Sequence, residues 1–411
     1  MKKNKKKITG AFLGTIVEYY DYSLYAFSAG IIAEKFFPGL EKIESLMYVF
    51  AIYALSYFAK PLGSIFFSRI GDLYGRRISL RITMVGIALP TLTIGLLPGY
   101  NSIGFISTQI LILCRFFQGF FVAGEYDGAA IYVIEHLGKK HHYTASTIAR
   151  ATGVCGLVFG IASTNFFNSS IFPEWGWRVP FLLSMPLALV TIYYRKYLEE
   201  TPDFIKAKKA GLKFNNLITF IKEKWSTLVL VMLLAGGFGV TYQIAIIFMK
   251  QYLPMIAPKT SAIITTFSVL IVMVFGITMP LSGFLADKFS LSLVVKSSII
   301  LILFSCTLLI ISIYTDLFNL TLFACILLAV SVAPFNALAH GVIVKAFNVN
   351  ERYRGISLGH TSGSMLMSGT ANFICLFFMK KFGLSLFPIF YISFFAIITF
   401  ILLNIFDKKY K

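Results

Sequence analysis

Apolar runs of about 20 residues recur from one end of the chain to the other, the length that a helix needs to cross the hydrocarbon core of a bilayer. Charged residues make up only 13% of the chain and cluster between these runs, whereas a soluble protein would alternate buried and polar faces. Backbone groups inside a bilayer must be satisfied internally, and the runs lack the alternation of barrel strands. The sequence therefore predicts an all-α integral membrane protein.

Twelve transmembrane helices are expected, in two bundles of six. The longest polar interruption, "YLEETPDFIKAKKAGLKFNNLITFIKEKW", divides them into an N-terminal bundle at 1–197, a cytoplasmic linker at 198–225 and a C-terminal bundle at 226–411. The expected spans are 8–33, 46–68, 79–97, 104–135, 143–168, 178–197, 226–253, 261–285, 290–314, 318–347, 356–379 and 384–406. The first run follows a basic start, yet it contains acids and continues beyond the length of a signal peptide, so we interpret it as an uncleaved span.

Lys and Arg predict the orientation of these helices. Most of the 37 Lys and Arg residues lie at the two termini and in every second loop. The opposite loops contain only Lys35, Lys42, Arg178, Lys259, Lys380 and Lys381. Because cytoplasmic loops carry the excess of positive charge, both termini and the linker are expected in the cytoplasm. The net charge of +19 then reflects membrane topology, and we expect no nucleic-acid partner.

The two halves repeat one another. The loop after the second span reads "IGDLYGRRISLR" and the loop after the eighth reads "LADKFSLSLV", each with an acid, Asp72 or Asp287, just beyond a glycine-containing helix end. The loops after spans four and ten also match in position, and the latter contains Arg354. Such duplication is typical of a two-bundle transporter with a central binding site.

Four stretches of the first half carry a resemblance to a known family: "GTIVEYYDYSLYA", "FAKPLGSIFFSRIGDLYGRR", "RFFQGFFVAGEYDGAA" and "WGWRVPFLLS". They resemble the major facilitator superfamily and, within it, the metabolite:proton symporters that include proline/betaine, dicarboxylate, citrate and shikimate carriers. The chain departs from the family pattern at Lys60, where arginine is usual, at Asp127, where a small residue is usual, and in the Asp287 loop, which lacks the Gly-Arg-Arg ending. The resemblance implies a central cavity that opens alternately to each side of the membrane, driven by proton flow.

Acids in the first span are the main candidates for proton coupling. Glu18, Asp21, Tyr22 and Tyr25 lie at i, i+3, i+4 and i+7 of a helix and are expected to form one polar stripe. A carboxylate at the bilayer centre costs about 3 kcal/mol, so these acids should face a cavity or a partner.

Arg115 in the fourth span is the expected partner. It lies at a similar depth to the two acids, and it shares a helix face with Gln118 and Glu125. Its guanidinium suits either a substrate carboxylate or Glu18 and Asp21. A static salt bridge between helices is the alternative. Three acids against one arginine leave a carboxylate free to titrate, and Asp127 is a further candidate for substrate binding or proton coupling.

The loop after the second span is the candidate gate. Gly71 permits close helix approach, Asp72 can cap or pair at a neighbouring helix N-terminus, and Arg76 and Arg77 can hold acids or carbonyl groups on the cytoplasmic side. Gly75 belongs to the same candidate gate. Asp287 and Arg354 are their counterparts in the second half. Membrane topology alone would also place the positive charges here.

The remaining candidates for chemistry are weak. No set of side chains has metal-ligand or catalytic spacing, and the five cysteines lie within apolar runs. His340 and His360 could titrate near neutral pH, but each could equally be a hydrogen-bonded histidine of the core. We expect no enzyme activity, no cofactor and no metal.

These observations predict a proton-coupled symporter of a small organic solute, acting as a monomer in a bacterial inner membrane. The second half offers few internal cations, so a zwitterion such as proline or betaine is favoured, with its ammonium group against tyrosine rings. The alternatives are a mono- or dicarboxylate:proton symporter, for example for a 2-oxoglutarate-like solute, and a non-transporting sensor on the same fold.

Overall fold

The computed structural model describes residues 2–74, 76–123, 142–195, 217–257, 261–347 and 352–410. All regular structure in these ranges is helical, as predicted. The first half contains α1 (Lys2–Phe27), α2 (Ala29–Phe36), α3 (Lys42–Tyr74), α4 (Arg76–Leu96), α5 (Tyr100–Ile103), α6 (Phe105–Val122), α8 (His142–Phe167), η2 (Gly176–Arg178), α9 (Val179–Leu182) and α10 (Ser184–Arg195). The second half contains α12 (Leu217–Tyr242), η3 (Gln243–Phe248), α13 (Met249–Ile256), α14 (Ser261–Lys288), α15 (Leu291–Thr315), α16 (Phe318–Ala337), α17 (Ala339–Ile343), η5 (Val344–Ala346), α18 (Arg352–Gly363), η6 (Ser364–Ser368), α19 (Ala371–Phe382) and α20 (Phe387–Lys409).

Eleven helical segments among the described residues are long and apolar enough to cross a membrane. Helix α1, which carries Glu18 and Asp21, precedes them and packs lengthwise against α8 and α10. Ser28 separates α1 from α2, yet its main chain continues the helical hydrogen bonds, accepting from Ile32 at 2.9 Å and donating to Leu24 at 2.9 Å. The N-terminal helices therefore complete the bundle as a nearly continuous rod.

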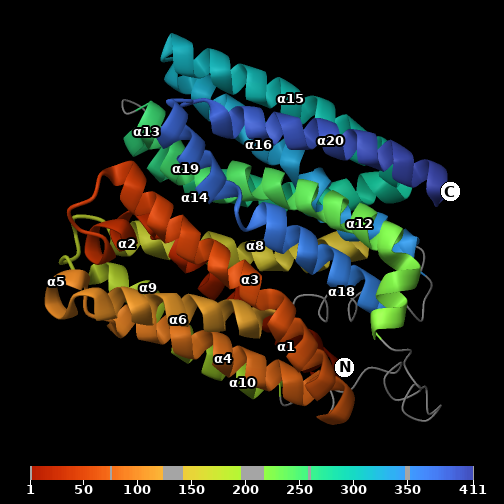
Figure 1. Cartoon of the computed structure of the whole chain (residues 1–411), viewed down its shortest axis with the longest axis horizontal. Helices are drawn as coiled ribbons and strands as arrows, with labels where there is room; N and C mark the ends of the chain where they lie inside the picture. Colours follow the sequence, from red (N-terminus) through yellow and green to blue (C-terminus); the bar gives the residue numbers. More distant parts are fainter. Residues whose placement is uncertain are drawn as a thin grey trace.

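The two halves form two bundles, lying one above the other in Figure 1. Within the first half, α3 and α4 pack on α6; within the second, α12 packs on α18 and α20, and α15 on α16. The halves meet along two helix pairs, α8 with α14 and α3 with α19.

Helix α14 illustrates why these sequences form lipid-facing helices. Val272, Phe275 and Met279 follow helical spacing and are at most 2% exposed, because they face the other helices. On the opposite face, Ile277 is 71% exposed and Leu281 is 55% exposed. An apolar residue on the outer face of a helix is favourable when the solvent is lipid, so the helix is apolar all round.

Several helices extend beyond the spans expected from the sequence, and α12 and α3 are examples. Helix α12 begins at Leu217, not at residue 226, and Phe220 is buried beside Phe347, with ring centroids 6.4 Å apart. Helix α3 continues to Tyr74, so the stretch containing Gly71 and Asp72, expected to be a loop, is its last turn, and Arg76 begins α4. Hydropathy marks where lipid contact ends, whereas helical hydrogen bonding continues beyond that point.

Close approach between α3 and α6 depends on two glycines. A Cβ on Gly119 would collide with the carbonyl oxygen of Ser56, and a Cβ on Gly63 would collide with that of Phe120. The backbones of the two helices are therefore in direct contact beside Arg115, which brings Ser56 within reach of that side chain.

Candidate functional site

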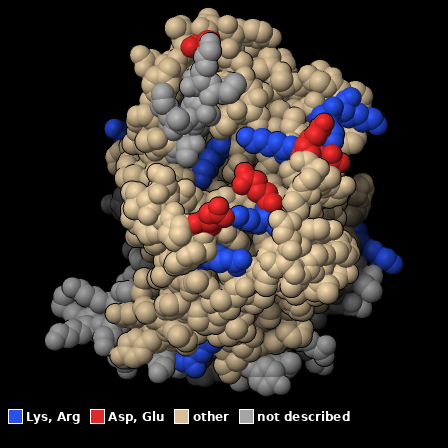
Figure 2. All heavy atoms as spheres, turned by 90° about the vertical axis from the view of Figure 1, so that its left-hand side faces the viewer, with Lys and Arg blue, Asp and Glu red and all other residues tan. Residues whose placement is uncertain are grey.

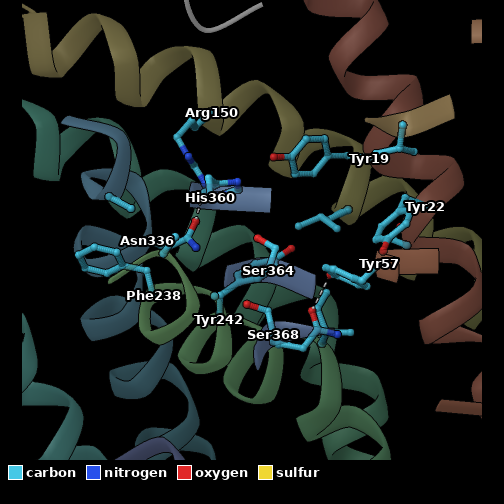
Figure 3. A pocket seen from close by; sticks show the side chains of 18 of the residues that line it. Tyr19, Tyr22, Tyr57, Arg150, Phe238, Tyr242, Asn336, His360, Ser364 and Ser368 are labelled. Carbon is cyan, nitrogen blue, oxygen red and sulfur yellow. Dashed lines mark hydrogen bonds between the residues drawn. The ribbon is translucent and has the colours of Figure 1, made fainter. Parts of the chain in front are cut away.

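A cavity with a volume of about 120 Å³ lies between the two halves. Its walls come from α1, α3, α6 and α8 of the first half and from α12, η3, α14, α16, α18 and η6 of the second (Figure 3). The lining residues range from the middle of these helices toward the end of the bundle where both termini lie. Both halves therefore contribute to a single central site.

Tyrosine rings form the first-half wall. Tyr22, Tyr53 and Tyr57 contact one another, with ring centroids 5.7 Å apart for Tyr22 and Tyr53 and 5.5 Å apart for Tyr53 and Tyr57. Tyr22 also bonds the Ser56 hydroxyl at 3.1 Å. Tyr19 and Tyr242 approach the same space from α1 and α12 (Figure 3). Such ring faces carry negative potential and attract cations.

Lys60 supplies a positive charge to the cavity. Its Nζ lies 3.8 Å from the centroid of the Tyr57 ring and 4.7 Å from that of Tyr22. In the sequence Lys60 stands out only as a departure from the family pattern, and it is not among the predicted site residues. Its position in an apolar span, four residues after Ser56 and three after Tyr57, was the available signal.

Glu18 also lines the cavity, as expected, although it is only 3% exposed. It interacts electrostatically with Lys60 and with Arg195 at the end of α10. The cavity therefore contains an acid and a base from neighbouring helices.

Asp21 lies away from the cavity, contrary to the expected common stripe. It is fully buried, and neither carboxylate oxygen has a hydrogen-bond partner among the described residues. The Ser184 hydroxyl of α10 lies next to this carboxylate and interacts with it, but outside the geometry of a hydrogen bond. Three residues along a helix correspond to a rotation of about 300°, so Asp21 is offset by about 60° from Glu18. This offset is enough for the two acids to face different surroundings, the cavity for Glu18 and α10 for Asp21.

Arg115 is buried behind the tyrosine wall and does not line the cavity. Its guanidinium donates to Gln118 Oε1 at 2.6 Å and to Ser56 Oγ at 3.1 Å. It also lies 4.3 Å from the centroid of Tyr25 and 5.0 Å from that of Tyr53. Within the described part of the chain no carboxylate pairs with it. The structure therefore does not form the expected pairs with Glu18 and Asp21.

Gln118 and Tyr25 belong to this buried layer. The Gln118 amide donates to Thr91 Oγ1 at 2.7 Å, and the Tyr25 hydroxyl donates to the Val49 carbonyl at 3.1 Å. Both side chains support the wall from behind, whereas Tyr22 faces the cavity. The predicted stripe thus separates into cavity residues, Glu18 and Tyr22, and residues outside the cavity lining, Asp21 and Tyr25.

A second polar group lies where α8, α16 and α18 meet. Arg150 donates to Asn336 Oδ1 at 3.2 Å, and His360 lies beside this pair (Figure 3). All three residues line the cavity. From the sequence His360 is only a weak candidate, and Arg150 and Asn336 are not among the predicted site residues, because an isolated polar residue in a span gives no sign of its neighbours.

Several predicted residues lie outside the described part of the chain. These are Glu125, Asp127 and Gly75, together with the side chains of Asp72, Arg76, Arg77, His340 and Arg354. The backbone of Gly71 lies in α3.

Asp287 is the predicted gating residue whose contacts the structure does describe. Its carboxylate accepts hydrogen bonds from the main-chain nitrogens of Tyr143 at 3.1 Å and Thr144 at 2.9 Å. It also accepts from the Thr144 hydroxyl at 2.6 Å. A residue of α14 therefore caps the N-terminus of α8 across the two halves.

The end of the bundle away from the termini is closed by contacts between the halves. Lys380 of α19 pairs with Glu44 at 2.9 Å and with Glu41 at 3.7 Å. Lys250 donates to Asn165 Oδ1 at 2.7 Å and to the Phe27 carbonyl at 3.3 Å. Figure 2 shows charges of both signs gathered on this face. No group of three metal-ligating side chains occurs in the described ranges.

Known transporters are similar to this chain over nearly its full length. A proline/betaine transporter of Salmonella typhimurium is 28% identical over 413 residues, which cover 96% of this chain and 82% of that protein. A putative proline/betaine transporter of Staphylococcus aureus is 31% identical over 423 residues, which cover 98% of this chain and 88% of that protein.

A solved structure shares the fold. The xylose transporter of E. coli in a partially occluded, inward-open conformation matches with a TM-score of 0.76, covering 98% of this chain and 97% of that chain at 13% identity. The family model of the Major Facilitator Superfamily matches residues 11–369 of this chain. The chain therefore belongs to the major facilitator superfamily, as a multi-pass membrane protein and a secondary transporter of small molecules.

Proposed function

We propose that this protein is a proton-coupled symporter of a small zwitterion of the proline or betaine class. The observation that carries the proposal is the central cavity, where Glu18 and Lys60 lie beside tyrosine ring faces. A zwitterion needs both signs of charge within a small volume. The similarity to a proline/betaine transporter and to a putative proline/betaine transporter supports the same class of solute.

The tyrosine wall suits the cationic end of such a solute. Quaternary and secondary ammonium groups bind to aromatic faces because the ring quadrupole attracts positive charge without requiring hydrogen-bond acceptors. Tyr19, Tyr22 and Tyr242 present rings to the cavity, and Phe238 adds another from the second half (Figure 3).

Proton coupling is assigned to the acids of α1. Glu18 lines the cavity, and Asp21 is buried without a hydrogen-bond partner. An ionised carboxylate without a partner in such a place costs several kcal/mol, so a change of its protonation state is coupled to any rearrangement around it.

Alternating access is assigned to contacts between the halves at the two ends of the bundle. The contact of Asp287 with Thr144 joins the halves at the end where the termini lie, and the pair of Lys380 with Glu44 joins them at the opposite end. Gly71, Asp72, Gly75, Arg76, Arg77 and Arg354 remain proposed parts of the gate on the cytoplasmic side. We place the protein in a bacterial inner membrane with both termini in the cytoplasm.

A mono- or dicarboxylate is the second candidate solute. It is favoured by the additional cationic groups at the cavity, since Arg150 and His360 line it together with Lys60. Two or three positive groups would suit an anion better than a zwitterion.

Uptake into proteoliposomes tests these proposals. Purified protein is reconstituted, and accumulation of radiolabelled proline, betaine and a series of mono- and dicarboxylates is measured with an inward proton gradient and without one. Accumulation of a zwitterion that requires the gradient is expected. Gradient-dependent accumulation of carboxylates alone would replace the first candidate by the second, and gradient-independent equilibration would contradict symport.

A further inference from the structure

Gln243 is an unusual residue of the cavity lining. It begins the π-helical segment η3 in the middle of the helix formed by α12 and α13, and it is only 1% exposed. Such wide turns in a helix are rare and occur frequently at functional sites. Its Oε1 accepts a hydrogen bond from the Tyr57 hydroxyl at 3.3 Å, whereas its Nε2 has no partner. A buried amide donor without a partner is costly unless a ligand completes it.

Lys60 also lies against Tyr57, over the face of its ring. Its ammonium group lies 3.8 Å from the Tyr57 ring centroid, and within the described chain its contacts are ring faces and the electrostatic interaction with Glu18. An ammonium group has three N–H donors, and a ring face satisfies them poorly. These donors remain available to a ligand in the cavity.

Tyr57 therefore connects two sets of donors from different halves of the protein. Its ring lies under Lys60 of α3, and its hydroxyl orients the amide of Gln243 in η3. Ser368 of η6, also in the second half, adds a buried hydroxyl that lines the cavity and has no hydrogen-bond partner.

We infer that Lys60 and Gln243 form the subsite that binds the carboxylate group of the transported solute. The inference rests on the proposed function and specifies which residues recognise the anionic end. One positive charge and N–H donors from two directions match a carboxylate, which offers two oxygens and only accepts hydrogen bonds. Arg115, the cation expected from the sequence, is a positioning residue, because it does not line the cavity and its guanidinium donates to Gln118 and Ser56 behind the wall.

This placement also explains how the solute influences the conformation. A carboxylate held between Lys60 and Gln243 joins the first half to the second, so its binding energy differs between states in which the halves approach or separate at the cavity. A ligand shifts a conformational equilibrium only through such a difference. A cation without a carboxylate can contact the tyrosine wall, but it lacks this connection.

The test compares glycine betaine with choline, which keeps the trimethylammonium group and replaces the carboxylate by a hydroxymethyl group. Affinities are measured by isothermal titration calorimetry on the full chain in lipid nanodiscs, for the wild type and for Lys60→Met, Lys60→Arg, Gln243→Leu and Gln243→Glu. Acetate, proline and a dicarboxylate complete the set of ligands. Asn372→Leu is the matched control, because Asn372 is a buried amide without a hydrogen-bond partner that does not line the cavity.

Lys60→Met and Gln243→Leu should each weaken betaine binding by about tenfold and leave choline binding within about twofold, since hydrogen bonds to a charged group are lost. Lys60→Arg should retain most of the betaine affinity. Gln243→Glu should reverse the preference, because a second carboxylate repels betaine and attracts choline. Asn372→Leu should retain the wild-type ratio. Unchanged choline binding shows that a variant is folded.

The outcomes separate this inference from the proposed function. If the variants keep the wild-type ratio of betaine to choline affinity, the subsite is wrong and the zwitterion symporter stands. If the wild type binds only the mono- or dicarboxylate, and Lys60→Met loses it, the subsite stands and the zwitterion assignment is wrong. If the wild type binds no compound that carries a carboxylate, both are overturned.

Discussion

Asp287 and Thr144 join the two halves of the protein through both the main chain and the side chain of Thr144, at 2.9 Å and 2.6 Å. The carboxylate belongs to α14, and the groups that it caps belong to the first turn of α8. A contact of this kind must break when the halves separate at that end.

We predict that Asp287→Ala opens the cavity from the side of the membrane on which the termini lie. Loss of a helix cap costs about 1 kcal/mol, which corresponds to roughly a fivefold shift between open and closed states. The measurement is the rate at which a membrane-impermeant thiol reagent modifies Ser364→Cys, a cavity position, in a variant without native cysteines. Asp407→Ala is the control, because Asp407 bonds Ser292 and Lys296 within the second half. Equal labelling rates in Asp287→Ala and Asp407→Ala would show that Asp287 is not part of the gate.

Lys380→Gln should have a smaller effect from the opposite side. The pair with Glu44 joins the halves, but both side chains are about one-third exposed, and water and salt screen such pairs. We expect labelling of Ser364→Cys from that side to rise by less than about threefold, and only at low salt. Lys35→Gln is the matched control, since the Lys35 pair with Glu174 lies within the first half. A large increase that persists at high salt would contradict this assignment.

Arg115 should be required for stability more than for solute affinity. Arg115→Met removes the hydrogen bonds to Gln118 and Ser56 and should destabilise the protein by about 2 kcal/mol. Thermal unfolding of the purified protein measures the loss, and a double-mutant cycle with Gln118→Leu should give a coupling energy of about 1 kcal/mol. Arg115→Lys should also be impaired, because lysine lacks the planar fork. A folded Arg115→Lys variant with strongly weakened betaine binding would instead indicate direct contact with the solute.

Asp21→Asn should uncouple transport without destabilising the protein. The carboxyl group is fully buried and lacks a hydrogen-bond partner, so the neutral amide replaces it without the cost of a buried charge. Accumulation driven by a pH gradient should be abolished, whereas solute exchange, which needs no net proton movement, should continue. Uptake and exchange in proteoliposomes distinguish the two. Loss of exchange together with accumulation would indicate a structural role.

Glu18→Gln should abolish accumulation and also weaken solute binding, because Glu18 lines the cavity and Asp21 does not. Titration calorimetry with betaine compares the two variants, and Asp21→Asn should retain the wild-type affinity within about twofold. If both acid variants still accumulate solute, coupling depends on other residues, and Glu125 and Asp127 are the next candidates.

The order of helices, their membrane location and the presence of mid-span acids follow from the sequence by itself. A bilayer requires apolar spans of a set length with every backbone group bonded internally, so hydropathy alone predicts helices and their approximate ends. Glu18 and Tyr22 were found in the same way, because polar residues in such spans must face a cavity or a partner.

Only the tertiary structure decided which of these residues reach the cavity. Helical spacing places Asp21 about 60° from Glu18, and this difference becomes decisive because α10 packs against one face of α1 while the cavity borders another. The contact of α3 with α6 gives Arg115 the Ser56 hydroxyl as a partner and buries it behind the tyrosines, whereas Lys60 and Gln243, from opposite halves, meet at Tyr57. Such pairings depend on the packing of helices that are distant in sequence, and no local pattern within one span encodes them.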